Sequence, residues 1–299
     1  DIHIKEFKRL GVTGDFENYY STMSFTAEAQ IVRELGKFLI DGSLYQGFKP
    51  VFWSTVEKTA LADAEVEYEE HTSNTIFTAF KIKKTPKDFL KDSNIIIWTT
   101  TPWTIPANRA LAFNSGIEYS LVEINNLENF EEKKIIVATN LLDSVVKACG
   151  IKKFETLKTF NGAEFEGTIC THPFHSLGFD FDVPMLDARF VTLEQGTGIV
   201  HCAPSHGPDD FNLCLKHNIP SKYTVDNSGY YTNEIPFFSK THVFKADPIV
   251  IDKLKELKKL LKNDKLQHSY PHSWRSKAPL IYRATPQWFI SMEKNSLRN

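Results

Sequence analysis

The sequence of 299 residues lacks any run of about 18 apolar residues, the length that a membrane-spanning helix needs, and shows no signal peptide. We therefore expect neither export nor membrane insertion, and predict a cytoplasmic protein. Cysteine is scarce as well, because only Cys149, Cys170, Cys202 and Cys214 occur and none of them form a CxxC pair. This usage favours reduced thiols over disulfides.

Compact metal-binding motifs are also missing. Four histidines lie near some of the cysteines in the sequence, namely His172, His175, His201 and His206. Their spacing to the cysteines matches no compact zinc-ligand pattern. We therefore predict that the chain holds no metal.

The chain has no excess of basic residues. Its 35 Lys and Arg against 37 Asp and Glu give a formal net charge of −2, unlike proteins that bind nucleic acid by charge alone. The densest basic stretch, residues 248–265, is predicted as a lysine-rich helix with Asp247 as N-cap and Pro248 at its first position. Its lysines either form a solvated face or contact a nucleic-acid backbone, and the pattern favours the solvated face.

One segment that is present stands out. Residues 95–108 read IIIWTTTPWTIPAN, an apolar run that ends in Thr99, Thr100 and Thr101 between Trp98 and Trp103. Three hydroxyls, each a donor and an acceptor, can orient a water molecule or the oxygens of a ligand, and the indole rings add amphipathic surface. The alternative is an ordinary edge strand with threonine on its solvent face.

A second segment lies about a hundred residues further on. Residues 196–212 read GTGIVHCAPSHGPDDFN, which predicts a short strand over 199–203, a turn, and a helix with Pro208 at its first position. Asp209 and Asp210 then lie in the first helical turn, where the helix dipole keeps carboxylates ionised. His201 precedes Asp210 by nine residues, so the turn brings both toward one cleft. Aspartates at a helix start are common, and only the pairing of the two segments indicates a site.

Together, WTTTPWTIPAN and GTGIVHCAPSHGPDDF resemble the two signatures of the editing domain inserted in the catalytic core of isoleucyl-tRNA synthetases, in their bacterial or organellar form. Valyl and leucyl relatives carry arginine where this chain has Thr101. KRLGVTGDFENYYSTM and HSYPHSWRSKAPLIYRATPQWF resemble the flanking pieces of the same enzyme, so essentially all of the chain is covered. Ser273 stands where many relatives have cysteine, which agrees with the absence of a metal.

The resemblance implies three regions: residues 1–45 as a residual core and hinge segment, 46–244 as the editing domain, and 245–299 as a helical and hinge segment returning to the core. The sequence pattern predicts an amphipathic helix over 27–40. It further predicts strands at 74–82, 94–100, 118–124 and 134–138, and helices at 141–148 and 208–217. Mixed strands with few helices predict an α+β fold built around a twisted β-barrel with peripheral helices, flanked by short pieces of synthetase core.

The implied activity is post-transfer editing, the hydrolysis of valine wrongly esterified to tRNA(Ile), with valyl-adenylate as an alternative substrate. A missing methylene is worth only about 1 to 3 kcal/mol in an apolar pocket, a limit for which this enzyme family is itself a known example, so a second sieve is needed. The implied partners are the tRNA(Ile) acceptor end and the rest of the synthetase. Neither a HIGH-like nor a KMSKS-like string is present. We therefore expect no adenylate formation and no cofactor for editing here, while ATP and Mg serve the parent enzyme.

The resemblance also implies residue roles. Asp210 holds the substrate's α-ammonium, with Asp209 beside it, and Thr99, Thr100 and Thr101 orient the water and the ester. The remaining substrate-binding residues are Trp98, Trp103, Thr104, Asn108 and His201, the last of which sets the size of the pocket. No GxSxG elbow or activated cysteine is present, so we expect no covalent intermediate. Two alternatives stay open: a non-catalytic module that binds the tRNA acceptor end, and an unrelated threonine- or serine-based esterase.

Overall fold

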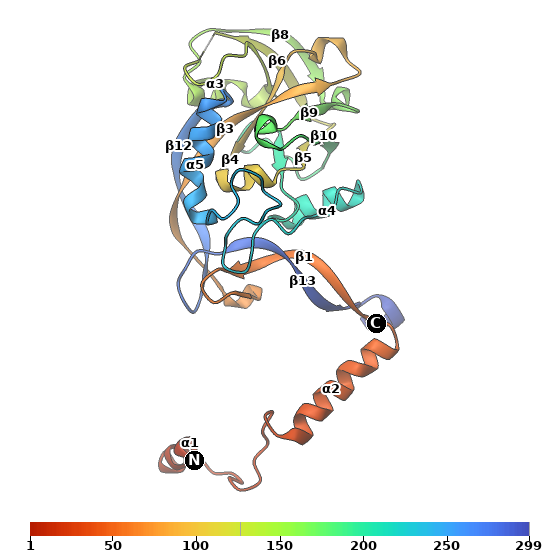
Figure 1. The fold of residues 1–299 in the computed structure, drawn as a ribbon, viewed down its shortest axis with the longest axis vertical. Coiled ribbons are helices and arrows are strands. Elements are labelled where there is room, and N and C mark those ends of the chain that lie inside the picture. Colours follow the sequence, from red (N-terminus) through yellow and green to blue (C-terminus); the bar gives the residue numbers. More distant parts are fainter. Residues whose placement is uncertain (126, 299) are drawn as a thin grey trace. The chain divides into compact units, whose positions relative to one another are not determined.

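The computed structural model describes residues 1–125 and 127–298. The chain divides into two compact units, a smaller one of residues 1–47 with the C-terminal stretch from 286, and a larger one of residues 48–285. The segment 245–285, assigned from sequence to the part returning to the core, contributes a helix and a long strand to the larger unit (Figure 1). No helix in the described residues is long and apolar enough to cross a membrane.

The smaller unit contains α1 (Ile2–Arg9) and α2 (Phe25–Ile40). The helix predicted over 27–40 is confirmed and begins two residues earlier, because the Ser24 side chain accepts a hydrogen bond from the backbone N–H of Ala27 and caps the first turn. Strands β1 (Leu44–Ser54) and β13 (Ile281–Ile290) contribute residues to both units and form a sheet of order β13-β1-β2 with β2 (Thr59–Ala60).

The larger unit is built on one long mixed sheet. Its strands are β3 (Val66–Lys84), β4 (Asn94–Thr99), β5 (Ala110–Phe113), β6 (Glu118–Ile124), β7 (Lys134–Ala138), β8 (Phe154–Asn161), β9 (Ile169–Thr171), β10 (Asp182–Asp187), β11 (Val200–Cys202) and β12 (Leu260–Ser273). The order is β11-β5-β10-β9-β3-β4-β7-β6-β8, and β12 pairs with β3 beside this path. The β5–β10 and β4–β7 pairs are parallel, and the others are antiparallel.

The α+β class predicted from sequence agrees with these mixed sheets and separate helices, but the expected β-barrel is absent. Within the described residues, no ladder joins β11 at one end of the order to β8 at the other. Strand β11 packs near β4 without pairing to it. A barrel requires every strand edge to be paired, and among the described residues the three-residue β11 pairs with β5 alone. The sheet is therefore open.

Three α-helices accompany this sheet, α3 (Leu142–Cys149), α4 (Pro208–Lys216) and α5 (Val243–Glu256). Gly150 ends α3 in the left-handed conformation, φ 67°, as its position predicted. Pro208 opens α4, also as predicted. Short 3-10 helices are η1 (Asp63–Glu65), η2 (Asp88–Leu90), η3 (Pro102–Ala107), η4 (Thr139–Leu141), η5 (Gly162–Phe165), η6 (His175–Leu177) and η7 (Lys294–Ser296).

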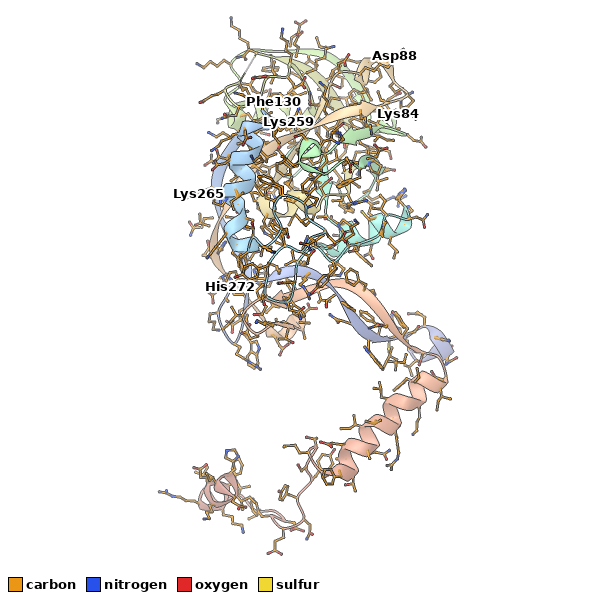
Figure 2. The ribbon with its side chains drawn as sticks, in the orientation of Figure 1. Lys84, Asp88, Phe130, Lys259, Lys265 and His272 are labelled. Atoms are coloured by element: carbon orange, nitrogen blue, oxygen red, sulfur yellow. The ribbon has the colours of Figure 1, made fainter. Side chains whose placement is uncertain are left out.

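The prediction of a lysine-rich helix over residues 248–265 is wrong at both ends. Helix α5 begins at Val243, where the His242 side chain accepts a hydrogen bond from the N–H of Phe244, and ends at Glu256. Lys258 then adopts a positive φ of 55°, and Lys259 and Lys265 belong to the stretch that leads into and along β12 (Figure 2). Pairing along the length of β3 outweighs the local helix preference of this segment.

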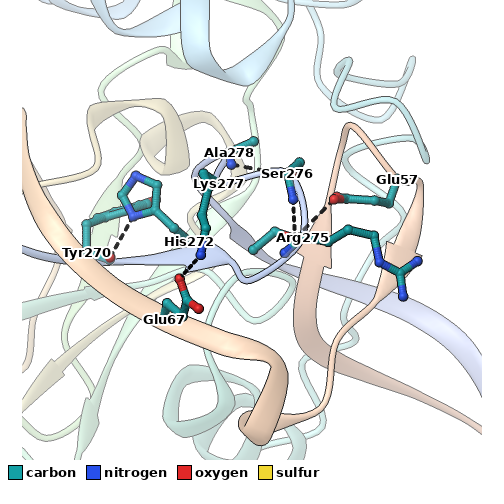
Figure 3. A network of polar contacts seen from close by, with 9 residues as sticks. Glu57, Glu67, Tyr270, His272, Arg275, Ser276, Lys277 and Ala278 are labelled. Atoms are coloured by element: carbon teal, nitrogen blue, oxygen red, sulfur yellow. Dashed lines mark hydrogen bonds and ion pairs between the residues drawn. The ribbon is translucent and has the colours of Figure 1, made fainter. Parts of the chain in front are cut away.

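The β3–β12 pair ends in a loop fastened by polar contacts (Figure 3). The Ser273 hydroxyl donates to Glu57 Oε1 over 3.0 Å, and Lys277 forms an ion pair with Glu67. His272 lies 2.8 Å through its Nδ1 from the backbone oxygen of Tyr270. Serine at position 273 therefore acts as a hydrogen-bond donor within the described chain.

Candidate functional site

The first signature segment leaves β4 at Thr99 and turns into η3. The Thr99 hydroxyl accepts a hydrogen bond from the backbone N–H of Thr101 over 3.1 Å and lies 3.2 Å from the Thr101 hydroxyl. The Thr101 hydroxyl in turn lies 3.3 Å from that of Thr104. These contacts form a chain of three hydroxyls that fixes the turn. In the described structure, Thr100 takes no part in it and forms no side-chain hydrogen bond.

A cleft of about 270 Å³ brings the two signature segments together. Trp98, Thr99 and Thr100 line one side. The opposite side is formed by residues 195–200, with Phe190 and Thr192 from the preceding stretch. The structure therefore places the free Thr100 hydroxyl at a wall that both signatures share.

Two glycines of the second signature make this close approach feasible. Gly196 and Gly198 have positive φ values of 82° and 73°, a conformation that other residues rarely adopt. A Cβ on Gly198 would lie 2.4 Å from the Cβ of Ala138. The backbone opposite Trp98 and Thr100 therefore requires glycine at both G positions of the GTG motif.

His201 lies behind the cleft, where its ring is nearly fully buried on β11. The Thr104 hydroxyl donates its one hydrogen to the backbone oxygen of Thr101 over 2.9 Å. It must therefore accept the hydrogen bond it shares with His201 Nε2, also 2.9 Å long. This places the proton of His201 on Nε2 and leaves Nδ1 as an acceptor toward Asn108 Nδ2, 3.5 Å away. Burial lowers the pKa of His201 to about 4, so the ring is neutral near pH 7.

Asn108 is also fully buried and does not reach the cleft wall. Its Nδ2 donates to the backbone oxygen of Ala110 over 2.8 Å. Its Oδ1 has no partner among the described residues. Thr104 and Asn108, both predicted to bind substrate, contact His201 from its two sides.

Asp210 sits in the first turn of α4, half-buried, and its Oδ2 accepts a hydrogen bond from the backbone N–H of Ala203 over 2.8 Å. The expectation that the helix dipole keeps it ionised is not met. Burial raises the pKa of Asp210 to about 7, with the neighbouring Asp209 carboxylate adding to the rise, although the Ala203 N–H opposes it. Desolvation outweighs the helix dipole because the carboxylate packs against the loop after β11. Asp210 is not among the residues that line the cleft.

Asp209 and Trp103 are not among the residues that line the cleft. Asp209 is exposed and lines a neighbouring groove. Trp103 is buried, with its ring edge-on to His206 at 4.8 Å between centroids. Its backbone N–H donates to Asp247 Oδ1 over 3.0 Å, which ties η3 to α5. Trp103 thus supports the site from within the core.

Sequence reasoning missed Phe190, Thr192 and Gln195 as cleft residues and His206 as a supporting one. The first three lie within six residues before the GTG signature, and that proximity was the available signal. His206 lies within the second signature, and both of its ring nitrogens have partners, at Tyr282 O and Thr224 Oγ1. Asp247, predicted as a helix N-cap, lies inside α5, and nothing in the sequence indicates its contact with η3.

This arrangement suits a hydrolysis that depends on positioning. The described residues include no cluster of His, Cys, Asp and Glu placed to hold a metal ion. The one histidine bonded to a threonine hydroxyl near the cleft, His201, contacts Thr104, whose hydrogen is already donated to a backbone oxygen. Among the described residues, the cleft hydroxyls without a hydrogen-bond partner are those of Thr100 and Thr192. Activation of a threonine nucleophile by a neighbouring base, as a covalent esterase requires, is therefore not built into the described residues.

Comparison with known proteins gives matches along the whole chain. Residues 1–299 match a family model described as tRNA synthetases class I (I, L, M and V). The chain is 66% identical over 298 residues to an isoleucine–tRNA ligase of Pelagibacter ubique, covering 100% of this chain and 33% of that protein. It is 47% identical to the corresponding ligase of Gluconobacter oxydans, covering 97% of this chain and 32% of that one.

The chain thus spans about a third of the length of these curated relatives. Among solved structures, one titled as the crystal structure of GlLeuRS-CP1 aligns with a TM-score of 0.49 at 11% identity, covering 64% of this chain and 99% of that chain. The editing domain of the cytosolic leucyl-tRNA synthetase of P. knowlesi aligns with a TM-score of 0.47 at 12% identity, covering 66% of this chain and 96% of that one.

Proposed function

The chain belongs to the class I tRNA synthetases of the I, L, M and V group, and we propose that it is the editing part of an isoleucine–tRNA ligase, which hydrolyses valine wrongly esterified to tRNA(Ile). The observation that carries this proposal is the cleft walled by both signature segments, with the free Thr100 hydroxyl facing it. Similarity along the whole of this chain to a third of an isoleucine–tRNA ligase supports it. Amino-acid activation, with its ATP and Mg, belongs in this proposal to the remaining two thirds of the parent enzyme.

In the proposed mechanism, Thr100 orients the attacking water or the ester oxygen, and the hydroxyl chain of Thr99, Thr101 and Thr104 holds its backbone in place. An aminoacyl ester is already reactive, so positioning and donors for the developing oxyanion are sufficient. Asp210 holds the substrate's α-ammonium. A cation at that point favours the ionised carboxylate and offsets the effect of burial on its pKa.

The direct test is the release of valine from valyl-tRNA(Ile) by this chain, with isoleucyl-tRNA(Ile) as the comparison substrate. A non-catalytic module that binds the acceptor end would bind both RNAs and release neither amino acid. An unrelated threonine- or serine-based esterase would accumulate an aminoacyl ester on the protein, which acid quenching and mass spectrometry detect.

Thr100→Val is expected to lower the rate of valyl-tRNA(Ile) hydrolysis by about 100-fold, the usual loss for one oxyanion or water-positioning donor. Thermal stability should stay unchanged, because this hydroxyl has no partner in the described chain. The matched control is Thr101→Val, which breaks the hydroxyl chain and should cost about 1 kcal/mol of unfolding free energy. If Thr100→Val retains full activity while Thr101→Val loses it, the substrate contact belongs to Thr101.

The activity should depend on pH through Asp210. Because its pKa is about 7 in the folded chain, kcat/KM should rise as pH rises toward 7 and then level off, as ionised Asp210 becomes available. Asp210 should also make the free energy of unfolding depend on pH. An aspartate whose folded pKa lies above its ordinary value of 3.8 loses stabilisation as pH rises between those values, because the folded state binds the proton more tightly.

Urea unfolding of the wild type and of Asp210→Asn, at about pH 5 and about pH 8, isolates that contribution. The asparagine variant should gain stability relative to the wild type as pH rises. An unchanged difference between the two proteins at both pH values would show that Asp210 titrates normally.

A further inference from the structure

A second groove, of about 500 Å³, lies next to the cleft. Helix α4 forms one wall through Asp209, Asn212 and Lys216, and the stretch after β10 forms the other through Arg189 and Phe190. Phe190 also lines the cleft. The two depressions therefore lie on either side of the Phe190 ring, and Phe190 is 37% exposed.

The groove carries two cations that are free to meet a ligand. Arg189 and Lys216 are exposed, and within the described residues neither side chain takes part in an ion pair or hydrogen bond. The Asp187 carboxylate, which also lines the groove, is engaged by Ser115 through its backbone N–H at 2.7 Å and its hydroxyl at 2.9 Å. Asp209 is the other carboxylate of the groove.

The charges along α4 have a defined order. Asp209 and Asp210 occupy its first turn, and Lys216 its last. Lys216 follows Asp209 by seven positions along the helix, which corresponds to about 10 Å. A strand of nucleotides that ends in an aminoacyl ester has the complementary order, an ammonium at its end and phosphates further back. Helix α4 would show the same order if its charges only matched its dipole, and the experiment below separates the two explanations.

We propose that Arg189, Phe190 and Lys216 form a subsite for the single-stranded nucleotides that precede the aminoacylated one. The two cations contact their phosphates, and the Phe190 ring stacks on a base, as aromatic side chains do in other single-strand-binding proteins. This inference rests on the proposed function, because the cleft must hold the aminoacyl end for the groove to receive the rest.

The test compares the double variant R189A/K216A with the wild type on two substrates, valyl-tRNA(Ile) and valyl-adenosine, which has no phosphate. For valyl-tRNA(Ile), KM should rise by about tenfold or more at low salt, and the slope of log KM against log salt should fall by about 1 for each lost phosphate contact. The kcat values, and all constants for valyl-adenosine, should stay unchanged. The control K133A/K153A removes two exposed lysines that line a different groove. It should leave KM and kcat unchanged for both substrates.

Two results would overturn the subsite. One is an unchanged KM for valyl-tRNA(Ile) in R189A/K216A, and the other is an equal loss of activity on both substrates, which would indicate that the two residues act only through the stability of the fold. Binding of a fluorescein-labelled short single-stranded RNA, read by anisotropy, is independent of hydrolysis. If the wild type hydrolyses neither substrate yet binds this RNA through Arg189 and Lys216, the proposed function fails and the subsite stands.

Discussion

Asp210→Asn is expected to lower valyl-tRNA(Ile) hydrolysis by roughly ten- to a hundredfold while leaving the chain folded. The asparagine keeps an oxygen for the Ala203 N–H but is neutral at every pH, so it cannot pair with the α-ammonium. A hydrogen bond to a charged partner is worth about 1.5 to 3 kcal/mol, and each 1.4 kcal/mol is about a factor of ten. The loss should appear for valyl-tRNA(Ile) and valyl-adenosine alike, because both carry the ammonium.

The neighbouring Asp209→Asn is the matched control, since Asp209 is exposed on the same helical turn. It should change hydrolysis by no more than a few-fold. If Asp209→Asn is inactive and Asp210→Asn is active, the ammonium is held by Asp209, and the pH dependence assigned to Asp210 is wrong as well.

His201→Ala is expected to begin hydrolysing correctly charged isoleucyl-tRNA(Ile). The proposal is that the rigid, neutral ring of His201 sets the depth available to the amino-acid side chain. Inserting one extra methylene into a tight interior costs about 1 to 3 kcal/mol, so removal of the ring should narrow the preference for valine by roughly ten- to a hundredfold. Steady-state deacylation of the two charged tRNAs, with thermal unfolding as a check on folding, measures this directly.

His201 also holds Thr104, so a loss of order in the threonine turn is the competing explanation. Thr104→Val separates the two, because it keeps the side-chain volume and removes the hydroxyl that joins His201 to Thr101. If His201 is the sieve, Thr104→Val slows both substrates and keeps the preference for valine. If His201→Ala slows valyl hydrolysis and still ignores the isoleucyl ester, the wall of the sieve must be sought at Trp98 or Thr100.

Local signals in the sequence predicted much of the fold. Pro208 and Gly150 mark the start of α4 and the end of α3 because proline and glycine have backbone requirements that hold in any context. Strands β6 and β7 follow the predicted ranges because their apolar residues are buried in the sheet. The two signature segments meet at the cleft, but His201 and Asp210, which were expected to approach one cleft, are not among the residues that line it.

Long-range contacts account for what sequence could not show. Residues 260–265 have helix-like spacing but form a strand because β3 offers them a partner along its length. The burial of Asp210 depends on the loop after β11, and no local pattern reveals that its pKa is raised rather than lowered. The open sheet likewise depends on how few residues β11 contributes to pairing.

The same limit applies to the site. Thr99, Thr100 and Thr101 look equivalent in the sequence, yet hydrogen bonds occupy two of them and leave Thr100 free. Thr104 and Asn108 resemble cleft residues but are buried beside His201. Arg189 and Phe190 line a groove because α4 packs across from them, and the sequence gives no sign of this contact.

The most direct measurement is the rate at which this chain releases amino acid from valyl-tRNA(Ile) and from isoleucyl-tRNA(Ile), each prepared with the same tRNA and assayed under the same conditions. The proposed function predicts hydrolysis of the valyl ester well above the spontaneous rate and little or none of the isoleucyl ester. Equal hydrolysis of both esters would contradict the sieve. Release of neither amino acid, by chain that is folded and binds the tRNA, would contradict the assignment of an editing hydrolase.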